Sequence, residues 1–271
     1  MLLSVLAAAA AIAVPSGDVL VAETSGSLRI VTRSGRPVRR LAWKLDGEAQ
    51  AIELSRDRRH AYVSRWRADL PAELDVYDLA TGARTLIADA VSPALSPDQR
   101  RLAYVSLRRE NDITFRTALV VKTLRTGALQ TIPIVPIDAL GTPPELVVNW
   151  APDGRHIALF SGKHVYLVDL ARTTVIPSRG PPGLVYTFAP VYLSSTALVV
   201  QVGCCIGRQR LVVVDLDFRR RFAFATLSSP VEQVRRIGRG KLLIVTALHE
   251  LAVVSRGRVR VIAHNVVAAA R

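Results

Sequence analysis

The sequence predicts an all-β protein that folds as a six-bladed β-propeller with about four antiparallel strands in each blade. Three observations carry this prediction. Short runs rich in Val and Leu alternate with turn residues along the whole chain, which is typical of many short strands. A strand-ending signature recurs at a near-constant spacing, as a propeller requires. Half of the 271 residues are hydrophobic, enough to bury a sizeable core.

The clearest copy of the repeat runs from Asn149 to Leu170. Its first turn, residues 152–154, reads Pro-Asp-Gly: Pro presets φ, Asp can accept backbone hydrogen bonds and Gly accepts positive φ. An apolar strand, a second turn and a third strand follow. The third strands of the six copies end 40 to 46 residues apart, at Thr32, Asp78, Thr123, Asp169, Asp215 and Ser255.

The turn signature moves in step with the strand ends, clearly at Ser96–Gln99 and in degenerate form at Leu193–Ser195. The six copies account for nearly the whole sequence, so we expect one propeller domain over residues 14–271. One blade cannot bury both of its faces, so neighbouring blades must stack and the ring must close.

Two stretches, Ala94–Tyr104 and Trp150–Ala158, resemble the blade repeat of TolB-type, WD-like six-bladed propellers. Propeller domains of prolyl-oligopeptidase-like enzymes carry a similar repeat. The resemblance implies a fold rather than a function. TolB-type proteins are binding platforms of the bacterial envelope that carry an additional N-terminal α/β domain. We expect neither that domain nor a C-terminal hydrolase domain here.

The N-terminal residues 1–13 permit two interpretations. Leu2–Val14 is an Ala-rich apolar run with the length of a signal-peptide core, too short to span a bilayer, and Ala11–Ala13 supplies a small-x-small cleavage pattern. No Lys or Arg precedes it. We expect export, and the alternative is that residues 7–13 form the first inner strand and that the first blade is incomplete.

The formal net charge is +14, from 36 Lys and Arg against 22 Asp and Glu. A basic balance can indicate nucleic acid, an anionic membrane surface or an acidic polysaccharide as a partner. The Arg residues are scattered among turns and strand ends, without a basic arm or an aromatic-interleaved patch. We therefore interpret the charge as surface solubility, and expect no specific nucleic-acid binding.

Long, irregular loops between the second and third strands share one face of the predicted ring with the connections between blades. Binding concentrates on such loops when a rigid scaffold displays them. Asp69, Glu110 and Asp112 lie near the candidate residues, and the alternative is a solvated rim of mixed charge. The candidate binding residues in these loops are Arg65, Trp66, Arg67, Arg108, Arg109 and Arg208.

The two cysteines, Cys204 and Cys205, are adjacent and flanked by Gly203 and Gly207. Adjacent Cα atoms lie about 3.8 Å apart, closer than in an ordinary disulfide, but the glycines would help to accommodate a strained bond. One hypothesis is a vicinal disulfide that stiffens a loop on the binding face. The alternative is two thiols, one packed inward and one outward.

Catalytic and metal-binding motifs are absent from the sequence: it contains no GxSxG, P-loop, GxGxxG or HExxH pattern. We expect no metal or cofactor. His60 and His156 hold the same repeat position, so we interpret both as structural. The strand-ending aspartates should bond local backbone amides. Trp150 ends an apolar strand and is expected to pack between blades.

Together these features predict a non-catalytic, monomeric binding or scaffolding propeller that is secreted or located in the cell envelope. Its partner would be a protein or a small anionic or carbohydrate ligand. The alternative is a propeller enzyme, a hydrolase or lyase, with a site in the central channel. A cytoplasmic location is the alternative to export, and we expect no transmembrane segment.

Overall fold

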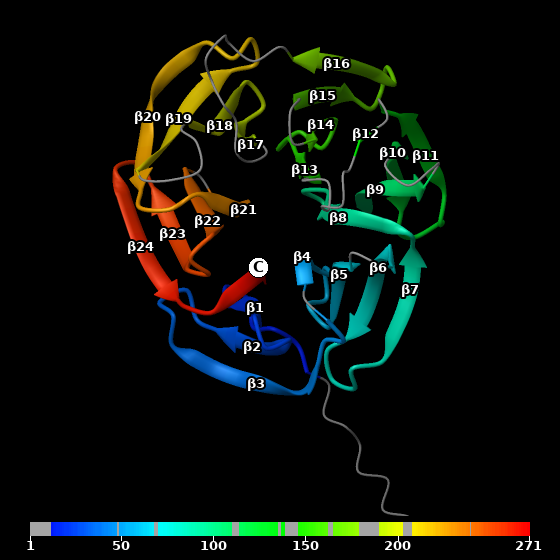
Figure 1. Cartoon of the computed structure of the whole chain (residues 1–271), viewed down its shortest axis with the longest axis vertical. Helices are drawn as coiled ribbons and strands as arrows, with labels where there is room; N and C mark the ends of the chain where they lie inside the picture. The colour runs from blue at the N-terminus through cyan, green and yellow to red at the C-terminus, as the bar shows by residue number, and fades with distance from the viewer. Residues whose placement is uncertain are drawn as a thin grey trace, which may run out of the picture.

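The structure is a computed structural model, and the residues that it describes are 12–47, 49–67, 70–109, 114–134, 137–138, 146–161, 165–178, 190–202, 208–238 and 240–271. These residues form six antiparallel sheets around a central axis, with no helix among them (Figure 1). The predicted six-bladed β-propeller is therefore confirmed. The described chain also contains no helix that could cross a membrane.

Each blade is named here in chain order, and its strands are given from the axis outward. Blade 1 contains β25 (Val266–Ala270), β1 (Val19–Glu23), β2 (Ser27–Val31) and β3 (Pro37–Lys44). Blade 2 contains β4 (Ala49–Leu54), β5 (His60–Arg67), β6 (Leu70–Asp78) and β7 (Arg84–Ala88). Blade 3 contains β8 (Ala90–Leu95), β9 (Arg101–Arg109), β10 (Thr114–Thr123) and β11 (Leu129–Pro133), with β12 (Ile137–Asp138) paired to β10.

The remaining three blades repeat this order. Blade 4 contains β13 (Leu146–Trp150), β14 (His156–Ser161), β15 (Val165–Asp169) and β16 (Thr174–Ser178). Blade 5 contains β17 (Val191–Ser194), β18 (Ala197–Val202), β19 (Gln209–Asp215) and β20 (Arg220–Leu227). Blade 6 contains β21 (Val231–Gly238), β22 (Lys241–Thr246), β23 (Leu251–Ser255) and β24 (Arg258–Ala263).

The ring closes through blade 1, whose innermost strand comes from the C-terminal end of the chain. β25 pairs antiparallel with β1, with Val21 opposite Ala269. Blade 1 therefore has four strands, and β25 takes the place that the alternative interpretation gave to residues 7–13. Residues 1–11 lie outside the described part, so the signal peptide stays a prediction.

The hydrophobic core is divided into six clusters, one at each interface between neighbouring blades. Because side chains alternate along a strand, one strand feeds two of these clusters. Leu242 and Ile244 of β22 pack against blade 5, whereas Leu243 and Val245 pack against blade 1. The blades thus shield one another's apolar faces, as the repeat predicts.

Two tryptophans tie neighbouring blades together through their indole N–H groups. Trp150 Nε1 donates to the carbonyl of Ala94 in blade 3 at 2.9 Å, and the Arg101 guanidinium lies 4.8 Å from the centre of its ring. Trp43 Nε1 donates to the carbonyl of Leu79 in blade 2 at 3.2 Å. The prediction that Trp150 packs between blades is confirmed.

The segment before β1 is anchored against blade 2. The Val14 amide donates to the Arg58 carbonyl at 3.0 Å, and Arg58 Nε donates back to the Val14 carbonyl at 2.7 Å. The Val14 side chain is buried in the cluster between blades 1 and 2. Ile12 is partly buried and packs against the same cluster, whereas the domain start at residue 14 stays a prediction.

Candidate functional site

The strand order gives the ring two different faces. The turn face carries the connections from first to second strands and from third to fourth strands. In blades 2 to 4 these are residues 55–59, 79–83, 96–100, 124–128, 151–155 and 170–173. The long-loop face carries the connections from second to third strands and the crossovers between blades.

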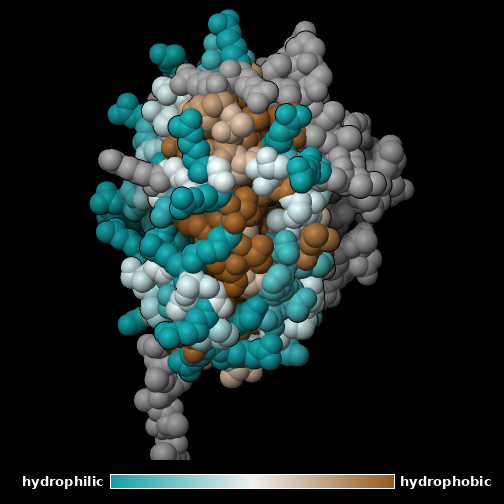
Figure 2. Space-filling view, turned by 90° about the vertical axis from the view of Figure 1, so that its left-hand side faces the viewer, coloured by the Kyte–Doolittle hydropathy of each residue, from teal (hydrophilic) through white to brown (hydrophobic). Residues whose placement is uncertain are grey.

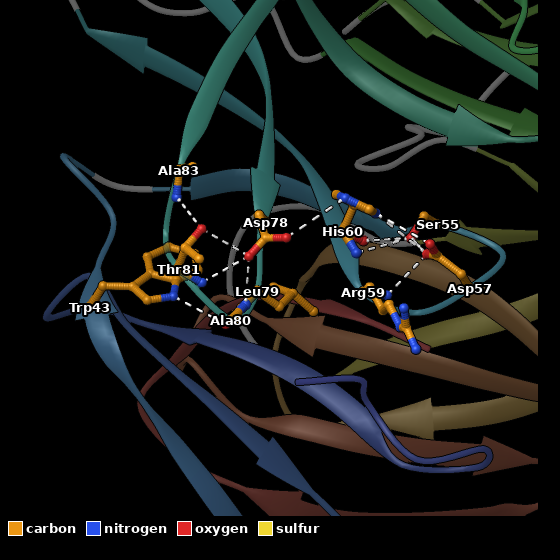
Figure 3. A network of polar contacts seen from close by, with 10 residues as sticks. All are labelled: Trp43, Ser55, Asp57, Arg59, His60, Asp78, Leu79, Ala80, Thr81 and Ala83. Carbon is orange, nitrogen blue, oxygen red and sulfur yellow. Dashed lines mark hydrogen bonds and ion pairs between the residues drawn. The ribbon is translucent and has the colours of Figure 1, made fainter. Parts of the chain in front are cut away.

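On the turn face of blade 2, a polar network joins the two turns (Figure 3). Ser55 Oγ donates to Asp57 Oδ1 at 2.5 Å, and the two nitrogens of His60 lie 3.4 Å from Asp57 Oδ2 and 3.9 Å from Asp78 Oδ2. Asp78 accepts the amide of Thr81 at 2.8 Å. These side chains are used in shaping the turns.

Blade 4 repeats the same arrangement. His156 Nδ1 lies 2.7 Å from Asp153 Oδ2, and Asp169 accepts the amides of Ala171 and Arg172. In blade 5, Asp215 accepts the amides of Asp217 and Arg219. The prediction that the strand-ending aspartates bond local backbone amides is confirmed, and the two equivalent histidines contact turn carboxylates as a structural role requires.

The hydrogen bonds of the turns shift their carboxylates toward the ionised form. The Thr81 amide and hydroxyl lower the pKa of Asp78, and the Ser96 hydroxyl and the Arg100 amide lower the pKa of Asp98. For Asp153, burial alone would raise the pKa, but hydrogen bonds from the following turn residues outweigh it and lower the pKa. Such groups favour turn formation and are poor candidates for proton transfer near neutral pH.

On the long-loop face, Arg65 is drawn into a charged network between blades 1 and 2. Its side chain is only 3 % exposed. Its Nη2 atom lies 2.7 Å from Asp75 Oδ2 and 2.5 Å from Glu73 Oε2, and its Nη1 atom donates to the Asp46 carbonyl. Arg84 Nε lies 2.9 Å from the other oxygen of the Asp75 carboxylate.

In this network the fully buried carboxylate of Asp75 lies between two positive charges, the guanidinium groups of Arg65 and Arg84. The hydrogen bond from Arg84 to Asp75 raises the pKa of Arg84. Beside it, burial raises the pKa of Tyr77, whose ring stacks on Trp43 of blade 1 with centroids 5.3 Å apart. Arg65 therefore links two strands of blade 2 to the connection that arrives from blade 1, and its guanidinium is turned inward and not toward solvent.

The other candidate binding residues belong to three blades. Arg108 near the end of β9 and Arg208 before β19 are exposed, in blades 3 and 5. Trp66, Arg67 and Arg109 end β5 and β9 on the same face, and their side chains lie outside the described residues. Residues 203–207, which include Cys204 and Cys205, also lie outside them.

The central channel is crossed by Arg235 of β21. Its Nε atom lies 2.8 Å from Glu53 Oε1 of β4, and both side chains are 17 % exposed. Its Nη1 atom lies 3.3 Å from Asn149 Oδ1 of blade 4, and its Nη2 atom lies 3.3 Å from the carbonyl of Pro93 in blade 3. One guanidinium thus joins blades 2, 3, 4 and 6.

A second side chain of β21 extends this channel cluster. Gln233 Nε2 donates to the carbonyls of Gln50 in β4 and, at 2.9 Å, of Val267 in β25. Burial raises the pKa of Glu53, although the positive charge of Arg235 acts in the opposite direction. The described channel therefore contains a charged cross-link whose polar atoms are largely directed at one another.

Sequence reasoning missed this channel cluster and the Arg65 network. A signal for the first does exist, because Glu53, Asn149 and Arg235 are polar or charged residues within innermost strands, which lie next to the channel. Among the described residues, no group of three or more His, Cys, Asp or Glu side chains is placed to hold a metal ion.

Comparison with known proteins reveals similarity in structure alone. No family model and no curated protein matches the sequence. A putative TolB from Agrobacterium tumefaciens superposes with a TM-score of 0.61 at 12% identity, over 91% of this chain and 88% of that one. The chain has a TolB-like β-propeller fold. TolB from Acinetobacter baumannii gives 0.55 at 14%, over 90% and 65% of the two chains.

Enzymes share the same architecture. An oligogalacturonate lyase in complex with manganese superposes with a TM-score of 0.55 at 13% identity, over 88% of this chain and 70% of that one. At such identities the fold is shared and the activity does not transfer. Function must therefore be argued from the sites of this chain.

Proposed function

We propose that the protein is a non-catalytic binding or scaffolding propeller that acts outside the cytoplasm, secreted or in the cell envelope. It presents a surface for a protein partner, or for a small anionic or carbohydrate ligand, on its long-loop face. The observation that carries this proposal is the Arg235–Glu53 cross-link, which engages the polar groups of the channel with one another. The structural similarity to TolB proteins supports a binding role.

The two faces differ in what they can offer a partner. On the turn face, serines, aspartates and histidines are engaged in the hydrogen bonds of their own turns. On the long-loop face, Arg108 and Arg208 are exposed, beside the β9–β10 and β18–β19 connections. Rigid scaffolds concentrate binding on such loops. The long-loop face is therefore the better candidate surface.

Site-specific photo-crosslinking in the producing cells tests this assignment. A photoreactive residue at Arg108 or Arg208 should give one discrete adduct, whereas the same residue at Arg56 or Arg125 on the turn face should give none. Equal adducts from both faces, or none from the long-loop face, would contradict the proposal. The conservative substitutions R108K and R208K serve as controls for folding and expression.

The enzyme alternative has its own test. If the channel were catalytic, turnover of an oligogalacturonate or a peptide substrate would depend on Glu53 and Arg235. We expect no turnover by the wild-type protein. Turnover that disappears in the Glu53→Gln variant, with folding retained, would replace the binding proposal by a channel enzyme.

A further inference from the structure

The positive charge of the chain is gathered on one half of the ring. Blades 5, 6 and 1 belong to residues 1–44 and 191–271. These two ranges contain 19 Lys and Arg and 6 Asp and Glu, so their net charge is 19 minus 6, or +13. Residues 45–190, which include blades 2 to 4, hold 17 against 16, a net charge of +1. The basic residues are divided almost evenly between the two halves, so the imbalance arises because 16 of the 22 acidic residues lie in the half that includes blades 2 to 4.

Within this half, the outer strands of blades 6 and 1 contain no acidic residue: none occurs in residues 24–45 or 251–271. The exposed side chains here form a surface that we name the basic wall. In the described part of the chain, the guanidinium groups of Arg36, Arg39 and Arg258 make no ion pair. The basic wall consists of Arg36, Val38, Arg39, Arg258, Val259 and Val261.

The outer strand of blade 6 contacts the turn before the outer strand of blade 1. Arg260 Nη2 of β24 donates to the Arg33 carbonyl beside β3 at 2.8 Å. Gly35 fits so closely against β24 that an added Cβ would lie 1.9 Å from the Ile262 carbonyl oxygen. Figure 2 shows this side of the ring: apolar surface runs through its middle, and hydrophilic side chains border it.

From this arrangement we infer that the basic wall docks on an anionic lipid surface. Arg side chains are attracted to acidic headgroups, and exposed apolar side chains of the same two outer strands enter the boundary between headgroups and acyl chains. Val38 is 48% exposed, and Val259 and Val261 are each 41% exposed. A soluble anionic polymer would be matched by the arginines alone, whereas these valines gain burial only against a partner with an apolar interior.

The geometry of the ring fits such docking. The basic wall is on its outer circumference, so contact through it leaves both the turn face and the long-loop face open to solvent (Figure 1). A flat lipid surface can meet the outer circumference of the ring. Docking at the wall would thus be independent of binding at the long-loop face.

Co-sedimentation with vesicles tests the inference. Wild-type protein should bind vesicles of phosphatidylglycerol and phosphatidylcholine in equal parts, and not vesicles of phosphatidylcholine alone. The triple variant R36Q/R39Q/R258Q should lower the partition coefficient about 10- to 100-fold. The matched control R56Q/R100Q/R125Q removes the same charge from exposed positions on blades 2 and 3, and should change it by no more than about twofold.

The apolar contribution is tested separately. The variant V259S/V261S should weaken vesicle binding several-fold while leaving the salt dependence of binding unchanged, because no charge is altered. Three results would overturn the inference: no vesicle binding by the wild type, an equal loss in the matched control, or unchanged binding in V259S/V261S. Binding to soluble polyglutamate or heparin without vesicle binding would assign the wall to an anionic polymer instead.

Discussion

Arg235 and Glu53 meet inside the central channel, with Nε and Oε1 2.8 Å apart, although 182 positions separate them in the sequence. The same guanidinium reaches the Pro93 carbonyl of blade 3, across the ring from its own blade 6 (Figure 1). A propeller is otherwise held together by contacts between neighbouring blades. This cross-link adds a connection between blades that do not touch, so we expect it to matter for stability.

Replacing Arg235 by Met should destabilise the protein by about 3–5 kcal/mol, because the Glu53 carboxylate would be left buried without its cation. The double variant E53Q/R235M should recover part of this loss, since no charge then remains uncompensated. Urea unfolding followed by tryptophan fluorescence measures both. An R235M variant within about 0.5 kcal/mol of wild type would show that the pair is solvated and structurally unimportant.

The cost of R235M should also depend on pH. Burial raises the pKa of Glu53 above its usual value, so folding disfavours its charged form relative to the unfolded state. Below the unfolded pKa the carboxyl is neutral in both states, and the variant should lose little. As pH rises through the folded pKa, the carboxylate forms without Arg235 and stability falls. Unfolding free energies of R235M measured from acid to neutral pH should therefore diverge from wild type, while E53Q/R235M should follow it.

The fold could be predicted from the sequence because its signals are local and repeated. Each turn, such as that at Asp153, carries its own backbone preferences, and their spacing alone indicates blades. The channel cluster is different, because Glu53, Asn149 and Arg235 belong to three blades. No local sequence pattern indicates which inner strands face one another across the channel. Arg65 was expected in a loop surface for a similar reason: its burial depends on strand register with Glu73 and on Asp75.

The contact between Trp43 and Gly82 predicts a difference between two equivalent turns. A Cβ on Gly82 would lie 2.6 Å from the Trp43 ring, whereas one on Gly127, at the same repeat position, would meet nothing within 4 Å. Both glycines have positive φ, 75° and 71°, so alanine is strained equally at both. G82A should be more destabilising than G127A by about 1–3 kcal/mol, since the stacked Trp43 must shift. Thermal unfolding of the two variants gives the difference, and equal values would refute the contact.

The turn carboxylates predict how the protein responds to acid. Hydrogen bonds from Ser96 and Arg100 lower the pKa of Asp98, so its contribution to stability is present above its unfolded pKa and lost as pH falls through the folded pKa. D98N cannot ionise, so its free energy of unfolding should decline less steeply below about pH 4. The effect should be under about 1 kcal/mol, because the carboxylate is exposed and screened by water. If the free energy of unfolding of D98N falls as steeply with acid as that of wild type, Asp98 does not contribute to the acid response in this way.

The predicted bond between Cys204 and Cys205 can be decided by mass. Adjacent Cα atoms are about 3.8 Å apart, whereas ordinary disulfides span about 4.4 to 6.8 Å, so a vicinal bond is strained and more easily reduced. If it forms, the intact mass of the native protein should rise by about two units on reduction, as two hydrogens are taken up. C205S, which cannot form the bond, should show no rise. A wild-type mass that is unchanged by reductant would leave two ordinary thiols at this position.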